Sequence, residues 1–284
     1  MKKETLFVSF SGGRTSAFMC WWLLNNKEDK YNFIFVFANT GQEHEKTLDF
    51  VNECDKRFNL SLVWLEAVTH FNKRIGCTHK IVSYESASRN GEPFKDMVLE
   101  YGIPNKDWPH CNRELKINAI NSYMRSIGFK TSQPRAIGLR SDEMDRMNFK
   151  EVKAGRIIYP LIKWKPITKA EIRYWWSEQD FDLEVPEHLG NCVTCWKKSD
   201  RKLMTIAKQE PERFNFFKSL EQYSDIGPRE ETRVFFRGYN TVNDIFEMAK
   251  QDFNEFEDSM PELQLRLLDP IDFSNGCSDS CEAQ

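Results

Sequence analysis

The residues of this sequence with the most distinctive chemical spacing are two cysteines. Cys192 and Cys195 form a Cys-x2-Cys loop shortly after Gly190. Two thiolates at this spacing can bind one metal ion or one cluster. In a reducing compartment, paired cysteines indicate metal or redox chemistry rather than a structural disulfide. The loop therefore predicts an iron–sulfur site, a zinc site or a redox dithiol.

A second chemical feature is a glycine-rich loop over residues 11–16, between an expected strand and an expected helix. Paired glycines let the backbone approach an anion, and the N–H groups and dipole at a helix start stabilise its charge. No Lys-Ser/Thr pair follows at the spacing of a Walker A loop. We predict phosphate binding here, and the alternative is an ordinary turn with a serine N-cap. The predicted nucleotide-binding residues are Ser9, Ser11, Gly12, Gly13, Arg14, Thr15 and Ser16.

Polar and basic residues also follow two other expected strands. Ligands of open α/β sheets bind at the carboxyl ends of the strands, and a guanidinium presents a planar fork that suits phosphate or sulfate. The alternative for the arginines is a solvated helix face, and Lys116 is either an anion ligand or a solvated helix lysine. We expect these residues at the nucleotide, with Arg140 and Lys116 also catalytic: Asn39, Thr40, Gly41, Lys116, Gly138, Arg140 and Arg146.

The hydrophobic pattern supplies the elements that position these residues. Short apolar runs alternate with helical patterns through the N-terminal half. This order predicts an α/β fold, a doubly wound parallel sheet with helices on both faces. The segment 76–92 is expected to be a polar loop. The expected strands cover 5–10, 32–37, 62–65, 135–138 and 157–159, and the expected helices cover 16–24, 45–58, 92–101, 114–127 and 168–179.

The character of the sequence changes near residue 180, without a Pro-, Gly- or Ser-rich linker. We predict a nucleotide-binding α/β domain over residues 1–180 and a smaller C-terminal cysteine-containing subdomain over 181–284. The second part is expected to hold helices over 200–209 and 241–253 and to end in a polar tail.

The glycine-rich loop resembles the S-G-G-x-D-S loop of the N-type ATP pyrophosphatases, with Thr15 at the acidic position. Four further stretches are similar to one branch of that superfamily, the phosphoadenylyl-sulfate and adenylyl-sulfate reductases. The turn Asn39-Thr40-Gly41, with Thr47 after it, resembles the D-T-G…E-T segment of that branch. Residues 111–117, Cys-Asn-Arg-Glu-Leu-Lys-Ile, resemble its C-C-x-x-R-K-V segment.

The other two similar stretches lie further along the chain. Residues 138–146 resemble the G-x-R…E…R segment of the reductases, and residues 159–164 resemble their P-[IL]-x-x-W stretch. Together the similar segments span residues 5 to about 195. The resemblance implies an adenine nucleotide α-hydrolase-like fold that binds ATP or another adenine nucleotide.

The resemblance also implies a [4Fe–4S] cluster. Its ligands would be Cys111, Cys192 and Cys195, and Asn112 stands where the family has a second adjacent cysteine. The fourth ligand would be a tail cysteine, Cys277 or Cys281, of which we take Cys281, or an exogenous group. Zinc is the alternative occupant.

The reductases carry a nucleophilic cysteine in the C-terminal tail. Cys277 lies in the corresponding region and is our expected catalytic thiol, but the Glu and His of the family's E-C-G-[IL]-H motif are absent. Attack by a tail thiolate is therefore only one of the reactions that the sequence leaves open.

Composition narrows the class of protein. Hydrophobic residues make up 40% and charged residues 29%, which is ordinary for a soluble globular protein. No apolar run reaches the length of a membrane span, and the N-terminus lacks the order of a signal peptide, so we expect a cytoplasmic protein with no membrane partner. A net charge of −3 gives no whole-chain signal for nucleic acid. A local basic face and an RNA partner stay open, while the basic run 197–202 is interpreted as a solvated helix start.

These observations favour an ATP-pyrophosphatase-type enzyme of sulfur metabolism that performs adenylation or sulfur transfer. Its partners would be an adenine nucleotide and a sulfur donor or thiol reductant. The first alternative is a thiol-dependent sulfonucleotide reductase. The second is a non-catalytic nucleotide-binding module whose cysteines hold structural zinc.

Overall fold

A computed structural model describes residues 3–73, 75–226 and 232–258 of the chain. Within these residues the strands form one six-stranded sheet in the order β4-β3-β2-β1-β5-β6. All neighbouring strands run parallel except β3 and β4, which are antiparallel. The strands are β1 (Glu4–Ser9), β2 (Tyr31–Asn39), β3 (Val63–Val68), β4 (Thr78–Val82), β5 (Arg135–Ile137) and β6 (Ile157–Ile158).

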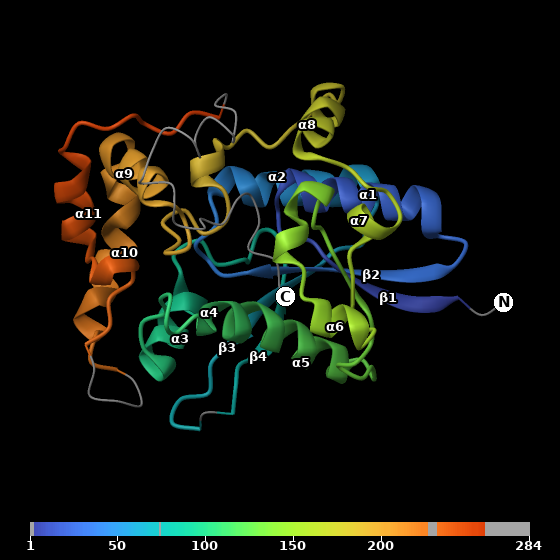
Figure 1. Cartoon of the computed structure of the whole chain (residues 1–284). Helices are drawn as coiled ribbons and strands as arrows, with labels where there is room; N and C mark the ends of the chain where they lie inside the picture. The colour runs from blue at the N-terminus through green and yellow to red at the C-terminus, as the bar shows by residue number, and fades with distance from the viewer. Residues whose placement is uncertain (1–2, 74, 227–231, 259–284) are drawn as a thin grey trace.

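Helices cover both faces of this sheet (Figure 1). α1 and α2 lie over one face, and α5 lies over the other, against β2, β3 and β4. The doubly wound α/β fold predicted from the alternating pattern is confirmed. The helices are α1 (Arg14–Lys27), α2 (Glu45–Phe58), α3 (Glu92–Tyr101), α4 (His110–Asn112), α5 (Asn118–Ser126), α6 (Phe149–Lys153), α7 (Pro160–Lys163), α8 (Lys169–Ser177), α9 (Asp200–Gln209), α10 (Asn215–Leu220) and α11 (Val242–Ala249).

The central strands are apolar because helices cover them from both sides. Leu6, Phe7 and Val8 of β1 have no exposed surface, as is typical of a buried parallel strand. At the start of α8, Thr168 accepts from the backbone N–H of Glu171 and Glu171 accepts from that of Thr168. The predicted capping box is therefore confirmed.

The edge strand β4 was not predicted, since residues 76–92 were expected to be a loop. It pairs antiparallel with β3 from Trp64↔Val82 to Val68↔Thr78. Ile81 is 63% exposed on this edge. A short strand with one solvated face carries too few apolar residues to be distinguished from a loop by its pattern.

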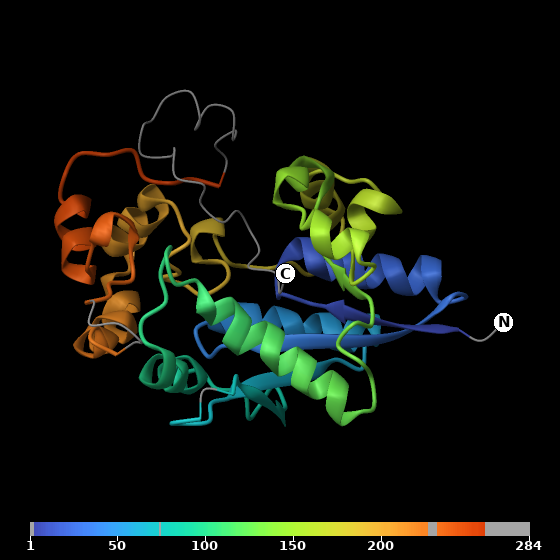
Figure 2. The same cartoon turned by 60° about the horizontal axis from the view of Figure 1, so that its bottom comes forward.

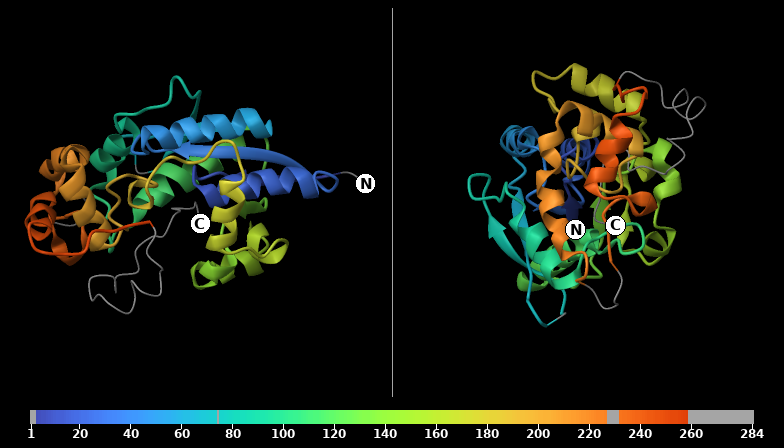
Figure 3. Two further views of the ribbon diagram at one scale, coloured as in Figure 1. Left: turned by 90° about the horizontal axis from the view of Figure 1, so that it is seen from above. Right: turned by 90° about the vertical axis from the view of Figure 1, so that its left-hand side faces the viewer.

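Helices α9, α10 and α11 lie at the carboxyl ends of the central strands, away from the N-terminus (Figures 2 and 3). Of these, α10 packs on α3 through aromatic rings, since the ring centroids of Phe217 and Phe94 are 5.3 Å apart. The cysteine loop precedes α9 and so lies at this same end. A division of the chain near residue 180 stays a prediction. In the described part of the chain, no helix combines the length and apolarity that crossing a membrane requires.

Candidate active site

The glycine-rich loop joins β1 to α1 at the carboxyl edge of the sheet. Gly12 has a φ of +86°, and a Cβ added there would lie 2.9 Å from Cγ2 of Thr47 on α2. Gly13 is the N-cap of α1, so the first N–H groups of a 14-residue helix follow it. The backbone is thus shaped and positioned as an anion-binding turn requires.

The serine hydroxyls of the loop contact each other. The Oγ atoms of Ser11 and Ser16 are 2.9 Å apart, and Ser16 Oγ donates to the carbonyl of Gly13 at 3.0 Å. Ser16 is fully buried. These bonds fix the shape of the loop, and binding of phosphate by Ser9, Ser11 and Ser16 stays a prediction.

Arg14 takes part in a different contact. Its Nε and Nη2 atoms donate to the Asp182 carboxylate at 2.7 and 2.9 Å, and Nη2 also donates to the carbonyl of Leu183. The Trp176 indole donates to the Arg14 carbonyl at 3.0 Å. Arg14 therefore ties the start of α1 to the segment after α8. This geometry gives the side chain a structural contact and leaves the predicted phosphate contact unsupported.

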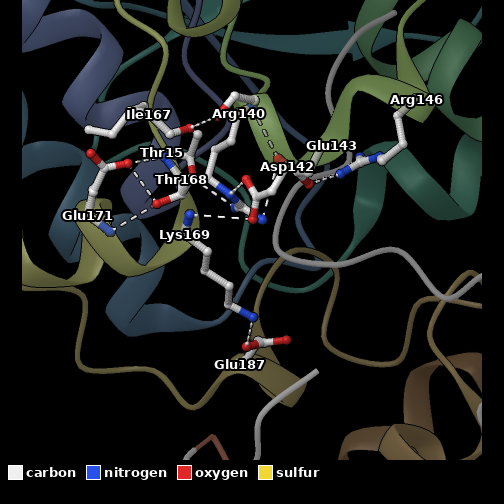
Figure 4. A network of polar contacts seen from close by, with 11 residues as sticks. Thr15, Arg140, Asp142, Glu143, Arg146, Ile167, Thr168, Lys169, Glu171 and Glu187 are labelled. Atoms are coloured by element: carbon white, nitrogen blue, oxygen red, sulfur yellow. Dashed lines mark hydrogen bonds and ion pairs between the residues drawn. The ribbon is translucent and has the colours of Figure 1, made fainter. Parts of the chain in front are cut away.

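Arg140 lies against the same loop and is only 2% exposed. Its Nη1 donates to Thr15 Oγ1 at 3.1 Å, its Nε bonds Asp142 at 3.0 Å, and its Nη2 lies 3.5 Å from Glu143 (Figure 4). The solvated-face interpretation is wrong for this residue. Arg146 forms an ion pair with the other carboxylate oxygen of Glu143, so it is connected to the loop through Glu143 and Arg140.

Gly138 also lies at this loop, because a Cβ there would be 3.0 Å from the Cα of Ser16. The predicted proximity of the 138–140 segment to the glycine-rich loop is therefore present in the structure. Gly138 matters here for its small size, because the absence of a side chain lets the end of β5 approach the first turn of α1.

A second polar hub continues from Asp142. The backbone N–H of Lys169 donates to Asp142 at 3.4 Å, and its Nζ lies 2.8 Å from the Glu187 carboxylate (Figure 4). Lys202 Nζ lies 2.7 Å from the same carboxylate. Burial alone would raise the pKa of Glu187, but Lys202 and Lys169 outweigh it and lower the pKa to about 2.

This hub corrects the interpretation of the basic run 197–202 as a solvated helix start. Lys198, Arg201 and Lys202 are all buried. Lys198 donates to the carbonyl of Gly190 at 2.6 Å, so it closes the cysteine loop. A run of charged residues predicts on average that their side chains are exposed. It does not reveal that buried hydrogen-bond acceptors lie within reach of those side chains.

The turn after β2 is also engaged with protein groups. Asn39 is fully buried and its Nδ2 donates to Glu66 at 2.6 Å and to the carbonyl of Ser88 at 2.8 Å. Gly41 has a φ of +76°, and a Cβ there would lie 2.9 Å from the backbone of Gly91. Asn39 and Gly41 therefore hold neighbouring loops together, and nucleotide contacts from them stay a prediction.

Thr40 connects this turn to the cysteines. Its Oγ1 bonds the Glu43 carboxylate at 2.9 Å and lies 3.3 Å from Cys192 Sγ. Glu43 also pairs with Cys192 in an antiparallel bridge. Sequence reasoning missed Glu43 and Glu66. The signal for Glu66 was a carboxylate inside an otherwise apolar strand, where it needs partners.

The three cysteines of the predicted metal site line one small cavity together with Lys116 and Thr40. Cys111 comes from α4, Cys192 and Cys195 come from the loop before α9, and Lys116 comes from a π-helical turn, Arg113–Ile117. Such turns are frequent at functional sites. Lys116 is 7% exposed, so its interpretation as a solvated lysine is wrong.

The electrostatics of this cavity centre on Cys192. Burial raises the pKa of its thiol well above the ordinary value, Glu43 raises it further, and Lys116 acts in the opposite direction. Cys277 and Cys281, the predicted tail nucleophile and fourth ligand, lie outside the described residues.

A glycine-rich turn after the first strand of a doubly wound sheet is an arrangement typical of the α/β class of nucleotide-binding proteins. Residues 5–85 match the family described as the phosphoadenosine phosphosulfate reductase domain. An uncharacterized nin region protein, ORF290 of Escherichia phage lambda, is 31% identical over 97% of this chain and 93% of its own length. The chain belongs to this reductase-domain family, which confirms the resemblance seen in the motifs.

Two more distant relatives come from Methanocaldococcus jannaschii. The uncharacterized protein MJ0973 is 25% identical over 75% of this chain, and the uncharacterized protein MJ0066 is 24% identical over 58% of it. The matches cover 47% and 29% of those proteins. Both are longer proteins of which this chain resembles only a part.

Proposed function

We propose that the chain is an adenine-nucleotide-dependent enzyme of sulfur metabolism, of the ATP-pyrophosphatase type. One observation carries this proposal: the glycine-rich loop and the thiol cavity lie at the carboxyl ends of two adjacent strands. The loop follows β1, and Thr40, which lines the cavity, follows β2. β1 and β2 are paired in parallel, with Ser9 opposite Val36.

The chain's own groups suggest how such a reaction would proceed. The N–H groups at the start of α1 bind the phosphates of ATP, and an acceptor oxygen attacks the α-phosphorus. The bond to the bridging oxygen of pyrophosphate breaks, pyrophosphate leaves, and an adenylated acceptor forms. Sulfur from a donor then attacks the acceptor atom and displaces AMP. Lys116 supplies positive charge beside the thiols, where it favours an anionic sulfur nucleophile.

We propose a [4Fe–4S] cluster at Cys111, Cys192 and Cys195, because three thiols around one cavity are the donor set that such clusters take. When bound, it would supply a site for holding or passing sulfur. Among the described residues, no three His, Cys, Asp or Glu side chains are grouped closely enough for a single metal ion.

Zinc and a cluster both accept thiolate donors. The resemblance to the reductases favours the cluster over zinc. The cavity has a volume of about 20 Å³, room for about one water molecule, so a cluster enters only when the cavity walls move apart.

The family match favours one other reaction, reduction of a sulfonucleotide. A thiolate would attack the sulfur of adenylyl sulfate, the S–O bond would break, and the nucleotide would leave. A thiol reductant would then release sulfite and form a disulfide. Cys277 is the proposed nucleophile of that route.

Products separate these proposals. The full chain, purified without oxygen, is incubated with ATP and, separately, with adenylyl sulfate or its 3′-phosphorylated form plus a dithiol. Pyrophosphate release from ATP supports the leading proposal, and sulfite release supports the reductase. Neither product, with stoichiometric zinc and retained nucleotide binding, would support a non-catalytic module.

A further inference from the structure

We propose that a groove beside the thiol cavity binds single-stranded nucleic acid, through its phosphates and one stacked base. The groove has a volume of about 630 Å³, within the range of small-molecule sites. Asn112 and Lys197 line both the groove and the thiol cavity, so the two hollows are adjacent. The inference rests on the proposed function only where the bound nucleic acid is taken as the acceptor substrate of that reaction. Binding of nucleic acid in the groove does not depend on the proposed function.

The groove is basic although the chain as a whole is acidic. Among the residues that the structure describes, Arg113, Lys197 and Arg233 line it together with a single carboxylate, that of Asp107. The formal net charge of the whole chain is −3. His110 also lines the groove. Cations gathered in this way bind phosphates by releasing counterions.

The cations differ in how firmly the protein holds them. Arg113 pairs with Glu114 at 2.8 Å, but its side chain is 62% exposed, so it can reach an outside phosphate. Arg233 is 4% exposed, and its Nη1 donates to the carbonyl of Tyr101 at 3.2 Å. One cation thus lies exposed at the rim, and another is fixed in the wall.

A flat surface lies among these charges. The guanidinium of Arg233 stands 4.4 Å from the centroid of the Trp108 ring, which holds the indole in place. Aromatic rings and guanidinium planes are the surfaces on which unpaired bases stack. A duplex keeps its base faces covered, so a stacking surface selects a single strand.

Asn112 adds an unsatisfied hydrogen-bonding group. Its Oδ1 atom is buried and has no hydrogen-bond partner among the described residues. Buried polar atoms are nearly always paired, and an amino group on the edge of a base would supply the missing donor. An acidic peptide would use the charges of the groove but would leave both the ring and this acceptor unused.

The test measures fluorescence anisotropy of short labelled single-stranded RNA and DNA with the full chain at low salt. We expect binding that weakens as salt rises. Replacing Arg113 and Lys197 together by Gln should weaken binding about 10-fold and make the salt slope shallower by about 1.4, at roughly 0.7 per lost phosphate contact. The arm that binds more tightly identifies RNA or DNA as the ligand.

Trp108→Leu should weaken binding about 10-fold with little change in the salt slope, because stacking is not ionic. Lys250→Gln is the matched control: this lysine at the C-cap of α11 has a side chain that is 70% exposed and is remote in sequence, and its replacement should leave binding unchanged. If Trp108→Leu does not fold, the double Gln variant still decides the matter.

Three results would overturn the inference: no binding of either oligonucleotide, equal binding by wild type and the double variant, or equal affinity for poly-glutamate. Gly12→Val separates this inference from the proposed function. Loss of ATP binding with retained oligonucleotide binding is expected, since the loop and the groove are different sites. Loss of both in a folded variant would mean that the oligonucleotide occupies the nucleotide loop instead.

Discussion

Arg140 is bound by two carboxylates and one hydroxyl within the protein. A buried cation with this many partners is well compensated, whereas the carboxylates left behind by its removal would not be. The residue therefore positions Thr15 and the glycine-rich loop, and any contact with substrate is made from this fixed place.

Replacement of Arg140 tests that role. Arg140→Gln should lower the free energy of unfolding by about 3–5 kcal/mol, the usual effect of breaking a buried ion pair. Arg140→Lys keeps the charge but loses the planar fork, so it should destabilise less and weaken ATP binding. Urea unfolding and calorimetric titration measure the two effects. Arg146→Gln is the control. The Arg146 side chain is 24% exposed and Arg140 remains beside Glu143 after the change, so this variant should cost less stability than Arg140→Gln. Equal effects at the two arginines would contradict this view.

Glu187 gives a pH-dependent prediction. Its pKa is about 2 in the folded chain and 4.5 ordinarily, so its stabilisation is complete above pH 4.5 and is lost as the pH falls toward 2. This loss is on the order of 3 kcal/mol. Glu187→Gln should be less stable than wild type at pH 7, and the difference should shrink below pH 4.5. Unfolding at several pH values measures it, and a constant difference would exclude the assignment.

The turn between β1 and α1 depends on one glycine. At Gly12 a side chain meets both a positive φ and Thr47 on α2, so the turn must distort to accommodate it. Gly12→Ala should reduce ATP affinity at least roughly 10-fold, because the N–H groups move away from the phosphate, and should cost about 1 kcal/mol or more in stability. Calorimetry with ATP gives the affinity.

Gly155 is the matched control for this turn. Its φ is +70°, but nothing lies within 4 Å of an added Cβ. Gly155→Ala should therefore cost stability through φ alone and leave ATP affinity unchanged. An unaltered affinity in Gly12→Ala would remove the glycine-rich loop from the nucleotide site.

At the scale of the whole molecule, the thiol cavity joins two parts of the chain about 80 residues apart. The protein purified without oxygen should contain iron and sulfide and should absorb visible light. Each of Cys111→Ala, Cys192→Ala and Cys195→Ala should remove that absorbance, because a cluster with only two protein ligands is labile. Cys54→Ala, at a buried position on α2, should retain it. A colourless wild-type protein with stoichiometric zinc would contradict the cluster.

Local pattern was sufficient for much of the fold. Alternating apolar runs and helical periods predicted the parallel sheet, and the capping box at Thr168 predicted the start of α8. The same kind of signal, two glycines between a strand and a helix, predicted the loop at the carboxyl edge. These features depend on residues close in sequence, whose spacing fixes their geometry. Strand β4 was not predicted because edge strands carry few apolar residues.

The sequence by itself determined the fold class, the family and the residue types of the site. Only the tertiary structure decided which of those residues meet. It placed Arg14 on Asp182, buried Lys116 and the 198–202 basic residues, and brought Cys111 to the cavity of Cys192 and Cys195. The physical reason is that a charged residue or a cysteine does not reveal, by its type and position in the sequence, which distant residue will compensate its burial. Such partners are chosen by packing between elements far apart in the chain.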